Sequence, residues 1–137
     1  MSDMTDYMES GLANSMLRGN PDSWALPTGI YVGLVTSVPS DGDPTVNELS
    51  GNGYTRVQVV QNTSNWTAVG VDGLTENAAA IEFPEATADW DTASGVVICD
   101  AGSGGNCYMK GTLTTPRQAL SGDVLRFKSG DLSVTYA

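Results

Sequence analysis

The sequence contains no histidine in its 137 residues. This absence removes the commonest general base and the serine–histidine–aspartate triad, and cysteine nucleophiles normally need a histidine partner as well. Paired carboxylates, the chemistry of glycosidases, are still present. The closest pairs in sequence are Asp89 with Asp91 and Glu82 with Glu85. Such alternating charges are ordinarily solvated, so we expect no enzymatic activity and no cofactor.

Positive charge is also scarce, because 6 Lys and Arg residues stand against 16 Asp and Glu residues and leave a formal net charge of −10. A chain of this charge repels phosphate backbones, so we expect no nucleic-acid partner. The sequence lacks both the apolar run of about 18 residues that a membrane helix needs and the apolar stretch of a secretory signal. We therefore expect a protein that is made and folded in the cytoplasm without membrane contact.

Only two cysteines are present, Cys99 and Cys107, and they flank a turn-like run at residues 102–105. A hairpin over this turn would bring the two cysteines within reach of a disulfide. Cytoplasmic synthesis favours the other interpretation, two reduced and packed thiols. Two thiols without histidine do not complete a zinc site of the usual kind.

Short segments rich in β-branched and aromatic residues alternate with breaks rich in Gly, Pro, Asp and Ser. The predicted strands lie at residues 30–37, 54–60, 66–71, 74–83, 95–101, 107–114, 123–128 and 132–136. Hairpin turns are predicted at 72–73, which pairs 66–71 with 74–83, and at 129–131, which pairs 123–128 with 132–136, with a similar turn at 121–123. This spacing predicts an all-β fold, a single two-sheet β-sandwich or jelly-roll-like domain of about eight strands. We assign residues 21–137 to this domain and residues 1–20 to an N-terminal α-helix or arm.

Residues 3–18 predict an amphipathic helix, with Ser2 or Asp3 as the N-cap and Gly19 as the terminator. Its apolar stripe is formed by Met4, Met8, Leu12 and Met16, which recur every four residues. Two interpretations follow from the stripe. The helix either packs on its own sandwich or acts as a docking arm that covers a neighbouring subunit.

The predicted strand at residues 54–60 alternates in polarity. Thr55, Val57 and Val59 share one face, and Tyr54, Arg56 and Gln58 share the other. An alternation of this kind is typical of a strand with one buried face. We expect the face with Arg56 to be solvated or to lie in an interface.

A long polar loop is predicted at residues 39–53, and loops of this length are often functional. Asp41 and Asp43 in this loop suggest a cation site, but the ligand spacing of a helix–loop–helix calcium site is not met, so we expect no metal. The loop is a candidate contact element.

The three tryptophans are candidate contact residues because aromatic side chains often anchor interfaces. They are Trp24, Trp66 and Trp90. Trp90 lies between two aspartates, which predicts a partly exposed indole.

Four stretches are spread from one end of the chain to the other: MSDMTDYMESGLANSMLRG at residues 1–19, IYVGLVTS at 30–37, IEFPEATADWDTASGVVICDA at 81–101 and SGDVLRFKSGDLSVTYA at 121–137. In this order they resemble a family of small proteins encoded in the structural regions of tailed bacteriophages, often labelled tail-fibre or minor structural proteins. Residues 81–84 followed by 88–90 are the most distinctive part. Similar chains often carry an aliphatic residue at one of the two cysteine positions. The resemblance implies a component of the phage virion.

Physical requirements then indicate a position within the virion. A fibre shaft needs a long repetitive or triple-stranded chain, whereas a capsid decoration (cement) protein needs a compact β-domain with an arm or loops that bridge capsid subunits. We therefore expect a decoration protein or head-spike base on the head surface, assembled in the bacterial cytoplasm. Its expected partners are the major capsid protein, copies of itself in a dimer or trimer, and tail or head-fibre proteins.

Two alternatives remain open. One is a tail- or baseplate-associated or tail-fibre adaptor, and the other is a carbohydrate-binding module, which depends only on the sandwich and an exposed tryptophan. For any of these roles the expected contact residues are Met4, Met8, Leu12, Met16, Trp24, Asp41, Asp43, Trp66 and Trp90.

Overall fold

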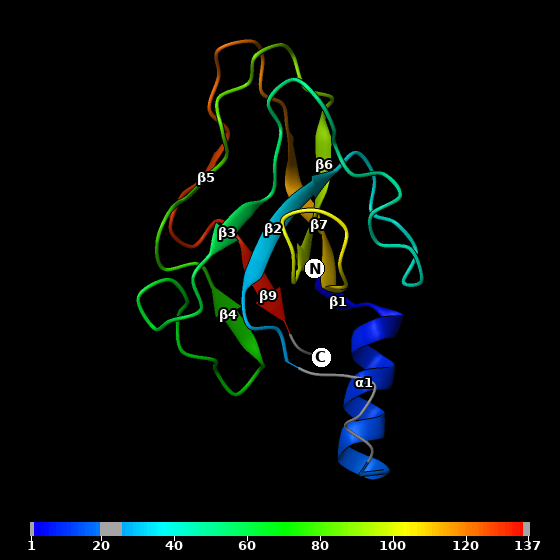
Figure 1. Ribbon diagram of the computed structural model, residues 1–137. Coiled ribbons are helices and arrows are strands. Elements are labelled where there is room, and N and C mark those ends of the chain that lie inside the picture. The colour runs from blue at the N-terminus through cyan, green and yellow to red at the C-terminus, as the bar shows by residue number, and fades with distance from the viewer. Residues whose placement is uncertain (1, 20–25, 136–137) are drawn as a thin grey trace.

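The computed structural model describes residues 2–19 and 26–135. These residues form one helix and nine strands (Figure 1). In chain order the elements are β1 (Ser2–Met4), α1 (Asp6–Leu17), β2 (Ile30–Val35), β3 (Val57–Val59), β4 (Leu74–Glu76), β5 (Ile81–Glu82), β6 (Ala93–Cys99), β7 (Cys107–Arg117), β8 (Arg126–Phe127) and β9 (Ser133–Thr135). The prediction of an all-β fold with one N-terminal helix is confirmed. No helix within the described ranges is long and apolar enough to cross a membrane.

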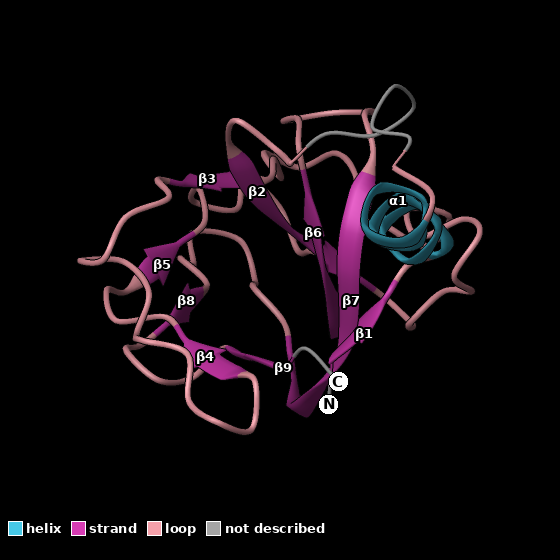
Figure 2. Ribbon diagram, turned by 90° about the horizontal axis from the view of Figure 1, so that it is seen from below, coloured by secondary structure: helices cyan, strands magenta, loops and turns pink. Residues whose placement is uncertain are grey.

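The strands form two layers that face each other (Figure 2). One layer is an antiparallel sheet in the order β1-β7-β6-β2-β3, and the other consists of the antiparallel pairs β4–β9 and β5–β8. The largest buried apolar cluster joins the layers, because Val32, Leu34 and Val96 of the large sheet belong to the same cluster as Ile81 and Phe127 of the β5–β8 pair. Burial of this apolar surface is the main favourable contribution to folding.

One long hairpin supplies strands to both layers. Its arms, residues 74–99 and 107–135, run antiparallel and keep register: Leu74 pairs with Thr135, Ile81 with Phe127, Ala93 with Arg117, and Cys99 with Cys107. Between the β5–β8 and β6–β7 ladders the arms stay joined, because the amides of Phe83, Ala86 and Trp90 each donate a 2.9 Å hydrogen bond to a carbonyl of the other arm. The hairpin thus passes from one layer to the other without separating.

The buried side chain of Asn77 holds the step between the β4–β9 and β5–β8 ladders. Its Nδ2 donates to the carbonyls of Ala79 and Lys128, and its Oδ1 accepts from the amide of Leu132, all at 2.9 Å. Its backbone also bonds the opposite arm, since its amide donates to Leu132 and its carbonyl accepts from Gly130. Both amide hydrogens and the amide oxygen of a 0% exposed side chain are therefore used.

Trp90 lies in the second irregular section of the hairpin. Its side chain is 4% exposed, its Nε1 donates to the carbonyl of Asn52 at 2.8 Å, and its ring meets Tyr54 edge-on at 5.4 Å. Gln118 Nε2 donates to the Trp90 carbonyl at 2.8 Å. The expectation of a partly exposed indole is wrong, because the residues 39–53 loop supplies an acceptor for the indole N–H while the ring packs in the core.

One pairing prediction and one predicted strand differ from the structure. Residues 123–128 do not pair with residues 132–135 across the turn at 129–131, although Gly130 there has a φ of +83°. Instead β8 pairs with β5, and β9 pairs with β4. The predicted strand at 66–71 is not regular, although the segment lies beside β4 as expected: an isolated bridge joins Trp66 to Asn77, and the amides of Thr67 and Gly70 donate to the carbonyls of Glu76 and Leu74 at 2.9 and 3.2 Å. The hydroxyl of Thr67 accepts from the amide of Glu76 at 2.9 Å, so a side chain takes the place of a ladder bond.

The helix begins at Asp6, three residues later than the predicted start at residue 3. Residues 2–4 instead form β1, which pairs with β7, and Thr5 is the N-cap, with its Oγ1 accepting from the amide of Met8 at 3.4 Å. The predicted caps Ser2 and Asp3 are therefore wrong, because a strand partner on β7 competes for these residues. The predicted end is confirmed, since Gly19 follows the helix with a φ of +61°.

We expect Asn77→Ala to lower the free energy of unfolding by about 2–4 kcal/mol, because the carbonyl of Ala79 and the buried amide of Leu132 lose their partner, while the carbonyl of Lys128 keeps only the amide of Asp131. Urea unfolding followed by circular dichroism measures this change. The matched control is Asn106→Ala, at an exposed position, which should change stability by less than about 0.5 kcal/mol. Equal effects of the two substitutions would show that Asn77 does not hold the hairpin step.

Candidate interaction site

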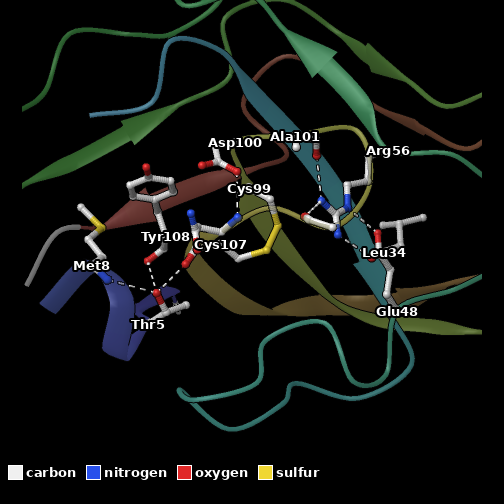
Figure 3. Close-up of a disulfide and its surroundings, with 12 residues drawn as sticks. Thr5, Met8, Leu34, Glu48, Arg56, Cys99, Asp100, Ala101, Cys107 and Tyr108 are labelled. Carbon is white, nitrogen blue, oxygen red and sulfur yellow. Dashed lines mark hydrogen bonds and ion pairs between the residues drawn. A yellow bond between two sulfur atoms is a disulfide. The ribbon is translucent and has the colours of Figure 1, made fainter. Parts of the chain in front are cut away.

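The tip of the long hairpin is closed by a disulfide between Cys99 and Cys107 (Figure 3). The two residues are register partners at the last rung of β6–β7, with Cα atoms 3.8 Å apart, and both are buried beside Val35 and Val97. The expectation of two reduced thiols is wrong, because the register places the sulfur atoms opposite each other. The predicted turn at residues 102–105 between the two strands is confirmed.

Thr5 joins the N-terminal arm to this tip. Its buried Oγ1 donates to the carbonyl of Cys107 at 2.6 Å, and its amide donates to the carbonyl of Tyr108 at 3.0 Å (Figure 3). The same oxygen accepts from Met8 at the first turn of α1. One threonine therefore caps the helix and fixes it to the strand that begins at the disulfide.

Arg56 joins the loop and the tip from the other side. Its guanidinium donates to both carboxylate oxygens of Glu48, at 2.7 and 2.8 Å, and to the carbonyls of Ala101 and Gly104, at 2.7 and 2.9 Å (Figure 3). Tyr54 donates to Glu48 at 2.8 Å. The hydrogen bond to Glu48 raises the pKa of Arg56, and burial raises the pKa of the Tyr54 phenol, so both groups stay protonated. This Arg56 clamp ties residues 48–56 to the hairpin tip.

The clamp corrects the prediction for residues 54–60. Arg56 is 8% exposed and Tyr54 is half-buried against the core, so this part of the face is not solvated, whereas Gln58 is exposed as predicted. The regular strand is also shorter, Val57–Val59. Sequence reasoning missed Arg56 because alternation does not distinguish a solvated cation from a buried, paired one. A signal was available in Glu48, an acidic residue eight positions earlier in the polar loop.

An apolar groove opens where α1, β6, β7 and β9 approach the segment that follows β3. It has a volume of about 500 Å³, and its walls include Met8, Ile30, Trp66, Ile98, Tyr108 and Val134. Leu26 and Val69 lie at its rim and are 71% and 61% exposed. The Nε1 of Trp66 is buried and has no hydrogen-bond partner in the described structure. We call this feature the apolar groove.

Acidic side chains gather on the other side of α1. Carboxylate oxygens of Asp6, Glu9 and Asp41 lie within 4.8 Å of one another. Asp41 also accepts from Lys110 Nζ at 2.7 Å, and this hydrogen bond raises the pKa of Lys110. Asp43 is exposed and does not belong to the group. Since Asp6 and Glu9 are exposed, the group is a solvated acidic surface partly neutralised by one lysine.

The predicted contact residues fall into separate places. Met4, Met8 and Leu12 pack in a second apolar cluster with Ile98 and Tyr108 of the chain's own sheet, which agrees with the packed alternative for the helix. Met16, the fourth residue of the stripe, is 78% exposed. Trp24 lies outside the described residues. Among the predicted residues that the structure describes, Met8 and Trp66 meet in the apolar groove. Trp90 is buried and does not supply the exposed tryptophan that the carbohydrate-binding interpretation requires.

A comparison with known families identifies the family of the chain. The matched residues include those of the long hairpin, the Arg56 clamp and the apolar groove. A family described as "Podophage GP4 fiber I protein gp80" matches residues 3–135. The chain belongs to this family. The expected membership in a family of phage virion structural proteins is thereby confirmed, and the virion is the place of action. A search of curated proteins finds no match.

We expect Arg56→Met to lower the free energy of unfolding by about 3–5 kcal/mol, because Glu48 and two carbonyls lose their buried partner. Chemical denaturation measures the change. Arg126→Met is the matched control: Arg126 pairs with Glu82 at 3.6 Å, both side chains are more than half exposed, and such pairs contribute about 0–1 kcal/mol. If Arg56→Met costs no more than the control, the Arg56 clamp does not stabilise this gp80-family protein.

Proposed function

We propose that this gp80-family protein is a compact adaptor module of a virion fibre and acts by docking to other virion proteins without catalysing a reaction. The observation that carries the proposal is the family match over residues 3–135, which includes every described strand from β2 to β9. The family description names a fibre protein, and the matched residues include both layers of the fold and its largest buried apolar cluster. A whole folded module, rather than a short motif, is therefore shared with fibre proteins.

The architecture supports the role of an adaptor better than the role of a fibre shaft. The described strands are short, and the longest, β7, folds back along β6 within the same chain. The hairpin ends in a closed disulfide tip, and the strand pairings of the described residues form a single unit that does not repeat along the chain. A unit of this kind fits at a joint or at the end of a fibre, where contacts to different proteins meet.

Capsid decoration is a second candidate, favoured by one specific feature. The N-terminal arm, β1 and α1, lies at the edge of the large sheet, and its last turn exposes Met16 and Leu17 at 78% and 85% (Figure 2). An apolar arm end at a sheet edge suits contact with a neighbouring capsid subunit. In this role the partners would be the major capsid protein and further copies of the chain.

Localisation on purified virions separates these roles. We expect gold-labelled antibody against the protein to mark fibres or the tail, and phage lacking the gene to form complete heads but fail in fibre attachment or adsorption. Labelled heads, together with gene-deleted heads that lose resistance to heat or osmotic shock, would instead support decoration. Absence of the protein from purified virions would overturn both proposals.

A further inference from the structure

We propose that the Cys99–Cys107 disulfide is a redox-controlled lock on the hairpin tip, which closes after the virion leaves the host cell and then fixes the N-terminal arm and the Arg56 clamp. The interior of a host cell keeps thiols reduced, whereas disulfides persist outside cells and on virion surfaces. A virion protein passes from the first environment to the second. The inference goes beyond the proposed function and needs only the virion as the place of action.

The disulfide lies where two attachments of the chain meet the hairpin (Figure 3). Thr5 Oγ1 donates to the carbonyl of Cys107 itself at 2.6 Å, and the Thr5 amide donates to the carbonyl of Tyr108 at 3.0 Å. Arg56 donates to two carbonyls in residues 101–104, at 2.7 and 2.9 Å. The disulfide therefore restrains the backbone that accepts hydrogen bonds from both attachments.

Hydrogen bonds between residues near the surface close the tip beyond the disulfide. The amide of Asp100 donates to the carbonyl of Asn106 at 2.9 Å, and the amide of Asn106 donates to the Asp100 carboxylate at 2.8 Å. Residues 102–106 are exposed. Exposed hydrogen bonds of this kind open locally at a low cost in free energy. With two thiols in place of the disulfide, the tip opens more often, and the acceptors of Thr5 and Arg56 move with it.

Burial of the two sulfur atoms makes the lock easier to close than to reopen. Cys99 is 0% exposed and Cys107 is 3% exposed. Thiol–disulfide exchange requires direct attack on a sulfur atom, so the reagent reaches either residue only when the tip opens. The dithiol form allows this opening and is oxidised. The disulfide restricts the same opening and thereby protects itself from a reductant.

The closing step needs an oxidant from outside the protein, and the class is a small-molecule disulfide, which forms when air oxidises the thiols of the broken cell. The thiolate of one cysteine attacks this disulfide, forms a mixed disulfide and releases one small thiolate. The thiolate of the other cysteine attacks the protein sulfur of the mixed disulfide, forms the Cys99–Cys107 bond and releases the second small thiolate. The two cysteines lose two electrons and two protons, and the small disulfide becomes two thiols.

The timing is tested by trapping thiols during infection. Infected cells are quenched in acid before lysis, released virions are kept in air, and both samples are denatured and alkylated with N-ethylmaleimide. Mass spectrometry then reads the state of Cys99 and Cys107. We expect both to be alkylated in the protein from cells and neither in the protein from virions. A disulfide already formed inside the cells, or free thiols in released virions, would overturn the proposal. Neither result depends on whether the protein lies on a fibre or on the head.

The effect of the lock is tested on the purified chain by hydrogen exchange at short labelling times, in the disulfide form and in the dithiol form kept in reductant. We expect the amides of Thr5, Met8 and Asn106 to exchange roughly tenfold or more faster in the dithiol form, because the tip and its attachments open more often. The amides of Asn77 and Gly130, which bond across the hairpin away from the tip, are the matched controls. Their exchange should change by less than about twofold.

Equal exchange of the tip amides in the two forms would overturn the lock. Faster exchange of the control amides by the same factor would also overturn it, because the disulfide would then stabilise the whole chain and not the tip. The double variant Cys99→Ala with Cys107→Ala gives a second decision, with circular dichroism to show that it is folded. It should show the dithiol pattern without reductant, and slow exchange of its tip amides would show that the disulfide does not hold the tip.

Discussion

Both layers of the sandwich depend on the continuous pairing of two chain segments, residues 74–99 and 107–135. Short ladders alone would be weak, since β5 and β8 are two residues long and β4 and β9 are three. They belong, however, to one hairpin that continues into the longer β6–β7 ladder. The apolar residues of the two layers are thus brought together by one antiparallel register, and cooperative folding of both layers follows from it.

The irregular sections of the hairpin are held by buried polar side chains. Asn77 bonds across one section, and Trp90 is fixed in the other by its indole N–H and its carbonyl. The rest of the chain is attached to this frame: Thr5 brings the N-terminal arm to β7, and Arg56 brings the 39–53 loop to the tip. Each attachment is a side chain bonded to backbone carbonyls, which gives a specific geometry to segments that lack ladder bonds of their own.

The sequence allowed the elements with strong local signals to be predicted. The helix end at Gly19, the turn at 102–105 and the strands on both sides of it follow from glycine, from apolar runs and from spacing. The pairing of 123–128 with 132–136 was predicted wrongly, because the sequence of a short apolar segment does not specify which strand it pairs with. Exposure was likewise predicted for Arg56 and Trp90 from their polar neighbours in sequence. Both are buried by tertiary contacts, which the local sequence does not indicate.

For the candidate site, the sequence pattern predicted Met8 and Trp66 as contact residues. It did not predict the groove that they share, because segments far apart in sequence form it. In this gp80-family protein, the disulfide tip and the Arg56 clamp are formed by different segments from the apolar groove. The closed disulfide tip and the Arg56 clamp stabilise one part of the module, whereas other segments form the apolar groove and carry the exposed side chains of Leu26 and Val69. In the proposed adaptor role, a rigid frame would lower the entropic cost of binding.

Native-state hydrogen exchange followed by NMR tests the continuous hairpin most directly. The account predicts that the amides of Phe83, Ala86 and Trp90, which lie between the regular ladders, exchange as slowly as those of β6 and β7, because all open in the same cooperative unfolding. Exchange of these three amides that is faster by orders of magnitude, with β6 and β7 still protected, would contradict it. The two layers would then be separate units, and the hairpin would not be the frame of the molecule.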